Sequence, residues 1–252
     1  MQGTMKDNET KPLLRRGGFT FKQFFVGHDR CGMKVTTDGV ILGGWTDVHN
    51  CQRVLDIGTG TGLLALMLAQ RSDERVVLDA VEIDGAAYLQ AKENVQASPW
   101  HQRIQVFHAD IQDYAEQTDE HYDLIISNPP YFPEGTDCRD EARSRARYTH
   151  ILSHHNLLMY VDRLLLPHGR FAVMLPCASG QSLEQLALSM GWFTLRRTWV
   201  SDVPDKPAYI ILLELTKAPS ICHEQHLVTH QPGRQSYTEQ FKQLAKDFYL
   251  AL

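Results

Sequence analysis

The sequence lacks several patterns that mark special classes of protein. No apolar run approaches the roughly 18 residues of a membrane-spanning helix, and residues 1–12 lack the apolar core of a secretory signal. The five cysteines are far apart and include no C-x-x-C pair, and no Cys/His group has the spacing of a zinc site. We therefore expect a cytoplasmic protein with reduced, unpaired thiols and no bound metal.

Internal repeats, low-complexity tracts and Pro/Ser-rich linkers are also absent, so no linker marks a sharp domain boundary. The 252 residues are enough to bury a sizeable core. Lys and Arg number 25 against 30 Asp and Glu, a net charge of −5, so a polyanionic partner would need local basic patches. We expect residues 51–252 to form one domain, with residues 1–50 as an extension.

Apolar, β-rich runs alternate with helical patterns along most of the chain. The strands are expected at residues 53–58, 76–84, 104–110, 122–128 and 169–176, and helices at 63–71, 86–98, 154–166 and 237–250. Two more strand-like runs, 193–200 and 208–215, have no helix between them and should pair antiparallel at one edge. The pattern predicts an α/β fold with a mostly parallel seven-stranded sheet, helices on both faces and an antiparallel edge strand.

A glycine-rich loop follows the first of these strands. Glycines at 58, 60 and 62 allow a tight turn and the close approach of a nucleotide cofactor. The dinucleotide pattern would place glycine at 63, where this chain has leucine. Asp56, at the end of the strand, would repel a diphosphate but suits a cofactor that carries positive charge, which indicates S-adenosylmethionine.

Acidic residues also end the next two strands. Glu82 can accept hydrogen bonds from both ribose hydroxyls, and Asp110 can accept one from the adenine amino group. Because ligands of open α/β sheets bind at the carboxyl ends of the strands, we assign cofactor binding to Asp56, Gly58, Thr59, Gly60, Glu82, Ile83, Asp110 and Ile111. Taken singly, each carboxylate could equally cap a helix or occupy a solvated turn.

The stretch "LIISNPPYF" ends a strand with Asn128, Pro129, Pro130 and Tyr131. The lone pair of an aromatic amine is delocalised, so two neutral acceptors that hold both N–H hydrogens would help the nitrogen to attack a methyl group. The Asn128 side-chain oxygen and the Pro129 carbonyl can be those acceptors, and the two prolines hold the turn rigid. The ring of Tyr131 can stack on an unpaired base. Alternatively, the tetrapeptide is only a turn after an edge strand.

Asp-x-Gly-x-Gly-x-Gly, followed by Glu82, Asp110 and N-P-P-Y, is similar to the pattern of class I methyltransferases that act on planar amino nitrogens. The segment 19–45, which contains "MKVTTDGVILGGW", and the late "FYL" closely resemble the bacterial valine-tRNA adenine-N6 methyltransferases. The resemblance implies a Rossmann-like fold and N6-methylation of adenine 37, just 3′ of the anticodon of tRNA-Val. It also implies that residues 1–50 cap the cofactor site.

In that family, segments like 33–39 lie beside the cofactor, so the resemblance makes Lys34, Thr37 and Asp38 candidates for its methionine end. An equally good reading is that Asp38 caps a helix that runs to Trp45.

Two basic segments could bind RNA despite the net negative charge. Arg15, Arg16 and Lys22 lie in an extension whose aromatic rings could anchor to the domain. Arg139, Arg143 and Arg147 recur every four residues and would share one helix face next to N-P-P-Y. The alternative for these arginines is a solvated helix in which Glu141 pairs with Arg145. We expect a monomer that binds tRNA.

Other functions use similar motifs. Protein glutamine-N5 methyltransferases carry a long helical N-terminal domain, for which the first 53 residues leave no obvious room, and ribosomal guanine-N2 enzymes often carry duplicated or extra domains. A non-catalytic subunit that binds S-adenosylmethionine would not need the paired acceptors at Asn128 and Pro129. A dehydrogenase is disfavoured by Leu63.

If Tyr131 stacks on the target base, Tyr131→Phe should retain most of the RNA methylation rate, whereas Tyr131→Ala should lower it by roughly tenfold or more, as expected for the loss of one stacking contact. Single-turnover rates with saturating cofactor would test this, and equal losses in both variants would contradict the stacking role.

Overall fold

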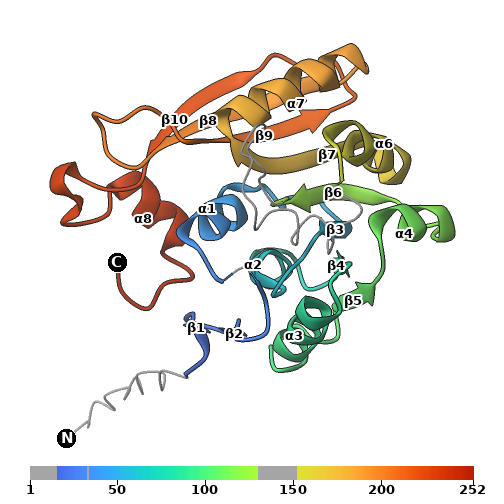
Figure 1. Cartoon of the computed structure of the whole chain (residues 1–252), viewed down its shortest axis with the longest axis horizontal. Coiled ribbons are helices and arrows are strands. Elements are labelled where there is room, and N and C mark those ends of the chain that lie inside the picture. Colours follow the sequence, from blue (N-terminus) through green and yellow to red (C-terminus); the bar gives the residue numbers. More distant parts are fainter. Residues whose placement is uncertain (1–15, 33, 130–151) are drawn as a thin grey trace, which may run out of the picture.

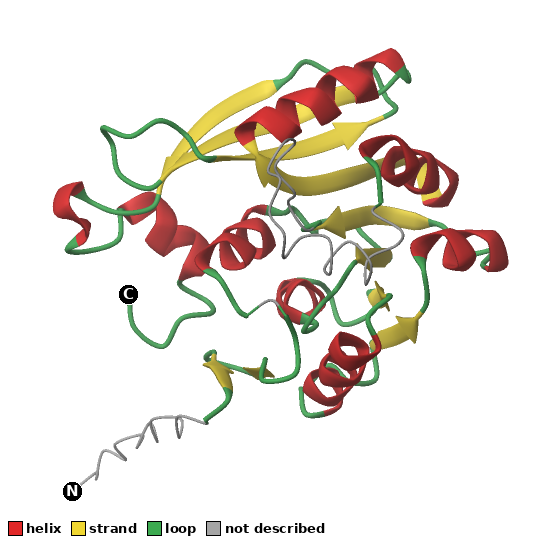
Figure 2. Ribbon diagram, viewed as in Figure 1, coloured by secondary structure: helices red, strands yellow, loops and turns green. Residues whose placement is uncertain are grey.

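The computed structural model describes residues 16–32, 34–129 and 152–252, in which a central sheet lies between two layers of helices (Figures 1 and 2). The order of its eight described strands is β10-β8-β9-β7-β6-β3-β4-β5. Their bounds are β3 Arg53–Ile57, β4 Val77–Glu82, β5 Ile104–His108, β6 Tyr122–Ser127, β7 Leu165–Pro176, β8 Phe193–Ser201, β9 Ile210–Thr216 and β10 His223–Val228.

The strands from β3 to β9 are the seven that the sequence predicts. The strands β5, β4, β3, β6 and β7 are parallel, and β9 pairs antiparallel with both β7 and β8. The remaining strand, β10, extends this end of the sheet by pairing parallel with β8. It was not predicted because its first four residues, HEQH, are polar and exposed and carry no apolar alternation.

The described helices are α1 Thr37–Trp45, α2 Leu63–Arg71, α3 Gly85–Gln96, α4 Ile111–Gln117, α6 His154–Leu164, α7 Cys177–Ser189 and α8 Glu239–Ala245, with a short 3₁₀ turn η1 at Pro232–Arg234. Of these, α4 and α7 were not predicted, and α8 ends five residues earlier than the predicted 250.

Strand residues alternate between two hydrophobic cores, one on each face of the sheet. On one face, Val54 packs in the core that α1, α2, α3 and α8 cover. On the other face, Leu55 packs in the core that α4, α6 and α7 cover. Successive side chains of a strand point to opposite faces of the sheet, so a sheet covered by helices on both faces needs apolar residues at successive positions.

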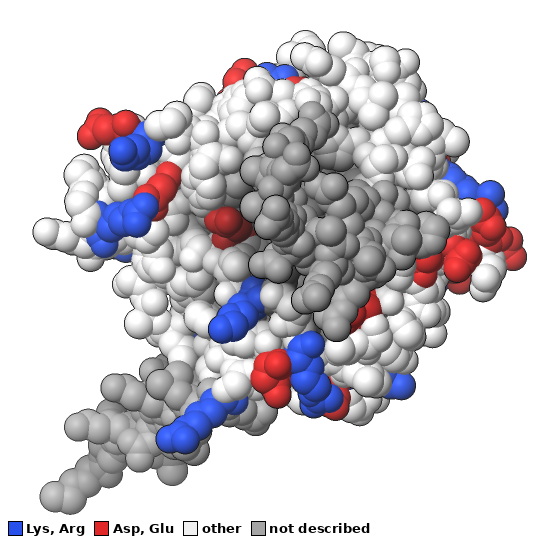
Figure 3. Space-filling model, in the orientation of Figure 1, with Lys and Arg blue, Asp and Glu red and all other residues white. Residues whose placement is uncertain are grey.

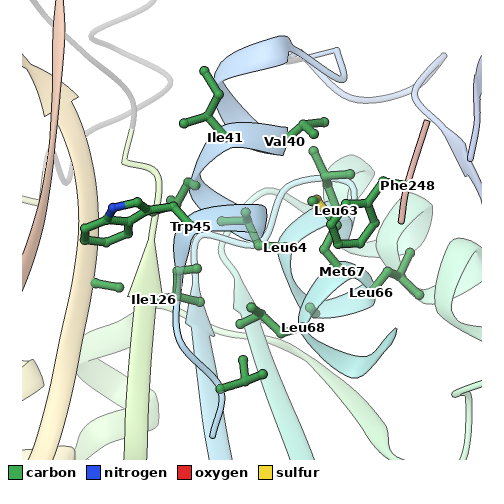
Figure 4. Close-up of a cluster of buried hydrophobic side chains, with 14 of the residues drawn as sticks. Val40, Ile41, Trp45, Leu63, Leu64, Leu66, Met67, Leu68, Ile126 and Phe248 are labelled. Atoms are coloured by element: carbon green, nitrogen blue, oxygen red, sulfur yellow. The ribbon is translucent and has the colours of Figure 1, made fainter. Parts of the chain in front are cut away.

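Helices α1 and α2 pack closely, and Figure 4 shows Val40 and Ile41 of α1 near Leu63 and Met67 of α2. The close approach depends on Gly43, because a Cβ there would lie 2.6 Å from the Met67 Sδ. Such small residues let two helices come nearer than larger side chains would allow.

The hairpin formed by β1 (Gly18–Thr20) and β2 (Phe25–Gly27) is held by aromatic packing. Phe21 stacks on Phe24 with ring centroids 4.5 Å apart, and both rings are buried in the same core as Tyr249. The Lys22 backbone N–H also donates to the Phe248 carbonyl at 2.8 Å. The extension is thereby joined to the segment after α8.

Three arginines and a buried carboxylate anchor the end of α1. Arg71 Nη1 donates to the carbonyls of Gly43 and Thr46, at 2.7 and 2.6 Å, which satisfies groups that a helix terminus leaves unpaired. Arg196 Nη2 donates to the Trp45 carbonyl at 3.0 Å, and its guanidinium lies 3.7 Å from the Trp45 ring centroid.

Glu214, on β9, is only 2% exposed and accepts from Arg170 at 3.1 Å and from Arg196 at 3.0 Å. Arg170 also pairs with Asp47, just beyond α1, at 3.0 Å. The buried carboxylate therefore joins the centre of the antiparallel region to the end of α1.

None of the helices within residues 16–32, 34–129 and 152–252 is both long and apolar enough to cross a membrane. Cys31, Cys51, Cys177 and Cys222 form no disulfide, and Cys138 lies outside the described residues.

Replacing Glu214 with Gln should lower the free energy of unfolding by about 3 kcal/mol, because two partly buried arginines lose their shared counter-charge. Urea unfolding would measure the change. The control is Glu224→Gln, since Glu224 is exposed and pairs with Arg197 at 3.4 Å, and that variant should change stability by about 0.5 kcal/mol or less. Equal effects would contradict the anchoring role of Glu214.

Candidate functional site

The sheet changes winding direction beside β3. From β3 the chain adds β4 and then β5 on one side, and it then crosses to the other side of β3 to form β6. In open α/β sheets, ligands bind outside the carboxyl ends of the strands at such a switch point. Ile57 pairs with Val81 on one side and Ser127 on the other, so Gly58, Glu82 and Asn128 come next in one row.

Residues 58–62, hereafter the glycine loop, follow β3, and the backbone conformation of the loop requires glycine at three positions. Gly58, Gly60 and Gly62 have φ values of 70°, 58° and 81°, a region that other residues rarely adopt. The N–H groups of Gly58 and Thr59 donate to the Val81 carbonyl, at 2.9 and 3.1 Å. A Cβ placed on Gly58 would meet no described atom within 4 Å, so there is open space at the start of the loop.

Asp56 is buried beneath this loop, with 1% of its surface exposed. Its Oδ2 accepts from the Thr59 hydroxyl at 2.5 Å and from the Ala65 N–H at 3.3 Å. Its Oδ1 is buried and has no hydrogen-bond partner among the described residues. Burial, with the charge of Glu82 adding to it, raises the pKa of Asp56 to about 7. Nearby positive charge would stabilise its ionised form.

Glu82 orients the loop from the end of β4. Its Oε2 accepts from the Gly60 N–H at 2.8 Å, and its Oε1 accepts from the Asp84 N–H at 2.9 Å. Burial raises the pKa of Glu82 although these bonds oppose the shift. The next residue, Ile83, is 50% exposed, which is unusual for an isoleucine and leaves an apolar surface beside the acid.

Asp110 and Ile111 lie two strands away from β3, after β5. Asp110 is the N-cap of α4 and accepts from the Gln112 N–H at 2.8 Å. It therefore does cap a helix, which is the alternative role that the sequence allows. The side chain is nevertheless half-buried rather than enclosed, while Ile111 is buried. Both residues remain at the predicted edge of the sheet.

Asn128 and Pro129 follow β6 on the opposite side of the glycine loop from Glu82, and both are half-buried. Ser127, buried just before them, donates its hydroxyl to the Ile57 carbonyl at 2.9 Å and so joins the ends of β6 and β3. Strands lie about 4.8 Å apart, so the ends of β4 and β6 are about 10 Å from each other. Pro130 and Tyr131 lie outside the described residues.

The start of α1 differs in one detail from the prediction. Thr36, not Asp38, is the N-cap, and its hydroxyl accepts from the Gly39 N–H at 3.2 Å. Threonine and aspartate are both favoured N-cap residues, so the local sequence does not show which of the two caps the helix. Asp38 instead accepts from the Tyr209 hydroxyl at 2.6 Å, and Thr37 is the half-buried first residue of α1. Lys34 is exposed.

Of the candidate RNA-binding residues, Arg16 and Lys22 are described and exposed. Lys22 Nζ donates to the Lys246 carbonyl at 2.6 Å, and this bond lies at the surface. Figure 3 shows basic and acidic side chains interspersed on the face of the molecule that it presents. Arg15, Arg139, Arg143 and Arg147 lie outside the described residues.

Comparison with known proteins identifies the family. A model described as the methyltransferase small domain matches residues 45–146. The tRNA1(Val) (adenine(37)-N6)-methyltransferase of Photorhabdus laumondii is 51% identical over 240 residues, which span 95% of this chain and 98% of that protein. The corresponding protein of Serratia proteamaculans is 52% identical over 236 residues, 94% of this chain and 91% of its own length. The chain belongs to this tRNA1(Val) (adenine(37)-N6)-methyltransferase family.

The fold of this family member also resembles solved structures. A structure described as a predicted O-methyltransferase from Agrobacterium tumefaciens matches with a TM-score of 0.66 at 19% identity, over 83% of this chain and 96% of that one. At that identity the likeness concerns the Rossmann-like methyltransferase fold alone. Within residues 16–32, 34–129 and 152–252, no group of three or more His, Cys, Asp or Glu side chains is arranged to hold a metal ion.

Sequence reasoning did not identify two side chains of the site in this member of the family. Ser127 joins the ends of β3 and β6, and Tyr209, 41% exposed, lies at the start of β9 at the same edge of the sheet. Burial and the bond to Asp38 raise the pKa of Tyr209. Tyr209 belongs to no recognisable local motif, and Ser127 directly precedes N-P-P-Y, but the sequence does not show that its hydroxyl bonds to the Ile57 carbonyl, because strand pairing brings the two together.

The ligand-free protein should become less stable as pH rises from 5 to 8. The raised pKa values of Asp56 and Glu82 mean that the folded state binds more protons than the unfolded state in this interval, so stability is greatest at low pH and is lost as pH passes about 7. We expect a loss of about 2 kcal/mol from Asp56. Urea unfolding at several pH values should show a shallower dependence for Asp56→Asn, and an unchanged slope would contradict the role of this carboxyl.

Proposed function

We infer that the protein transfers a methyl group from S-adenosylmethionine to N6 of adenine 37 in tRNA-Val. The observation that carries this inference is the identity of about half of all residues over nearly the whole length of the tRNA1(Val) (adenine(37)-N6)-methyltransferases. The arrangement of Asp56, Glu82 and Asn128 around one switch point supports it, because cofactor-binding and acceptor groups meet there.

The residues at the switch point fit this cofactor. Gly58 leaves space at the start of the glycine loop, and the buried Oδ1 of Asp56 has no described partner, so a cation nearby would lower the cost of its ionisation. We propose that Glu82 accepts hydrogen bonds from the ribose hydroxyls and that Ile83 packs against the adenine ring. Asp110 would accept from the adenine amino group, and Lys34, Thr37 and Asp38 would lie towards the methionine end.

The bound cofactor supplies an electrophilic methyl group: the adenine nitrogen forms a bond to the methyl carbon while the carbon–sulfur bond breaks and leaves its electron pair on sulfur. The nitrogen then loses one proton to water. The products are N6-methyladenosine, S-adenosylhomocysteine and a proton, so no further reactant is needed.

Asn128 and Pro129 would activate the nitrogen without acting as strong bases. The Asn128 side-chain oxygen and the Pro129 carbonyl accept the two N–H hydrogens, which directs the lone pair towards the methyl group. Holding the amine in one orientation also lowers the entropy cost of reaction. We propose that Tyr131 stacks on the target base, which costs little to expose because an anticodon loop is single-stranded.

The extension and the basic residues would bind the rest of the tRNA. We propose that residues 1–50 cap the cofactor site of the domain formed by 51–252. Arg15, Arg16, Lys22, Arg139, Arg143 and Arg147 would contact phosphates, which makes affinity depend on salt. We further propose that the protein acts as a cytoplasmic monomer and selects the valine isoacceptor.

The function can be tested with methyl-labelled S-adenosylmethionine, bulk RNA from cells that lack this gene, and nucleoside mass spectrometry. We expect label in N6-methyladenosine of a tRNA fraction. In the same assay Asn128→Ala should lower the rate by about a hundredfold or more, as for loss of a preorganised polar group at a reacting centre, while the affinity for S-adenosylhomocysteine changes only a few-fold.

Label found only in protein, or only in N2-methylguanosine, would overturn the proposed substrate. Equal loss of cofactor affinity and methyl transfer in Asn128→Ala would instead show that Asn128 acts in cofactor binding. Purified tRNA-Val and a second purified tRNA, compared under the same conditions, would test isoacceptor selection.

A further inference from the structure

The side chain of Asn94 on α3 joins two segments that are far apart in sequence. It is 5% exposed, and its Nδ2 donates to the carbonyl of Thr61 in the glycine loop at 2.8 Å and to the carbonyl of Gly27 at 2.9 Å. Its Oδ1 accepts from the Gly27 N–H at 2.9 Å. The side-chain NH2 group of one buried asparagine thus donates both to the glycine loop and to the extension.

Other residues on the same face of α3 contact the same two segments. Ala91, three residues before Asn94, lies 3.6 Å from the position of a Cβ on Gly62. Gln90, four residues before, accepts from the Arg30 N–H at 3.4 Å. This face of the helix therefore supports both the glycine loop and the residues that follow β2.

The segment after β2 lies directly beside the glycine loop. The Cys31 Sγ is 3.9 Å from the position that a Cβ on Gly60 would occupy. The approach of the hairpin to α3 is also close, because a Cβ on Gly27 would lie 2.8 Å from Gln90 Nε2 and 3.2 Å from Asn94 Oδ1. Only glycine at 27 leaves both amide side chains undisturbed.

Two side chains fix neighbouring peptide groups of the loop. Glu82 accepts from the Gly60 N–H, and Asn94 donates to the Thr61 carbonyl. Because the loop adopts φ values that are positive at three glycines, its peptide orientations depend on such bonds. A ligand that binds between the loop and the extension would require both to be in place.

We propose that Asn94 is a positioning residue of the methyl-transfer site, which holds the glycine loop and residues 27–31 together so that the extension forms one wall of the cofactor pocket. The inference rests on the proposed function, because it takes the glycine loop as the binding site of S-adenosylmethionine. Asn94 acts through the loop and the extension and does not itself contact the reacting atoms.

The first test compares Asn94→Ala with Ser98→Ala. Ser98 is a matched control: it is buried just after α3, donates to the Val95 carbonyl at 2.7 Å and accepts from the Trp100 N–H at 3.2 Å, and neither bond reaches the glycine loop or residues 27–31. Isothermal titration with S-adenosylhomocysteine should show binding weakened about tenfold in Asn94→Ala, an effect of the order of one lost buried hydrogen bond. Ser98→Ala should stay within about twofold.

Kinetics separate positioning from mere stabilisation. Asn94→Ala should raise the KM for S-adenosylmethionine about tenfold and change kcat less, because the loss is of cofactor binding. If Asn94→Ala is less thermally stable but its folded fraction binds S-adenosylhomocysteine with wild-type affinity, Asn94 is only structural and the proposal is overturned.

A second measurement uses the wild-type protein, in case the variant does not fold. Amide hydrogen exchange should slow at both Gly60 and Gly27 when S-adenosylhomocysteine is added, because the two segments open together. Slowing at Gly60 alone would overturn the coupling. Absence of any binding to the wild type would overturn the proposed function, and this inference with it.

Discussion

The site depends on the register of three adjacent parallel strands, β4, β3 and β6. Their pairing places Glu82, Gly58 and Asn128 side by side, so that the groups proposed to bind the cofactor and those proposed to hold the target amine come from neighbouring strand ends. A shift of one residue would turn each side chain to the other face of the sheet. The Ser127 hydroxyl bond to the Ile57 carbonyl secures one side of this register, and the bonds of Gly58 and Thr59 to Val81 secure the other.

Burial gives the same strand ends their electrostatic character. Burial raises the pKa of both Asp56 and Glu82, and the charge of Glu82 raises that of Asp56 further, so ionising Asp56 carries an electrostatic cost. A positively charged ligand reduces that cost, whereas a diphosphate would increase it. We propose that this charge, carried by the ends of β3 and β4, favours a sulfonium cofactor over a dinucleotide.

Much of the fold and of the candidate site could be predicted from the sequence, because the signals for them are local. The strands β3 to β9 carry apolar runs, the glycine loop carries its spacing, and Asp56, Glu82, Asp110 and Asn128 each lie within two residues of the end of a predicted strand. β10 could not be found, because a polar strand is defined by its partner β8 and not by its own pattern. For the same reason Asn94 and Tyr209 carried no signal: their partners are distant in sequence, and only the folded chain brings them together. The roles of the individual site residues remain predictions.

The anchoring of α1 has a consequence for the order in which the chain can fold. Arg170 contacts Asp47 across 123 residues of sequence, Arg196 contacts Trp45 across 151, and Lys22 contacts Lys246 across 224. During synthesis the early helix and hairpin are made long before these partners leave the ribosome. The β3-β4-β5 unit can pair as it emerges, but the extension has to wait for β7, β8 and the segment after α8, and closing such long loops is slow. Docking of the extension should therefore be a late step of folding, so that the wall proposed for the cofactor pocket is complete only when nearly all of the chain has been made.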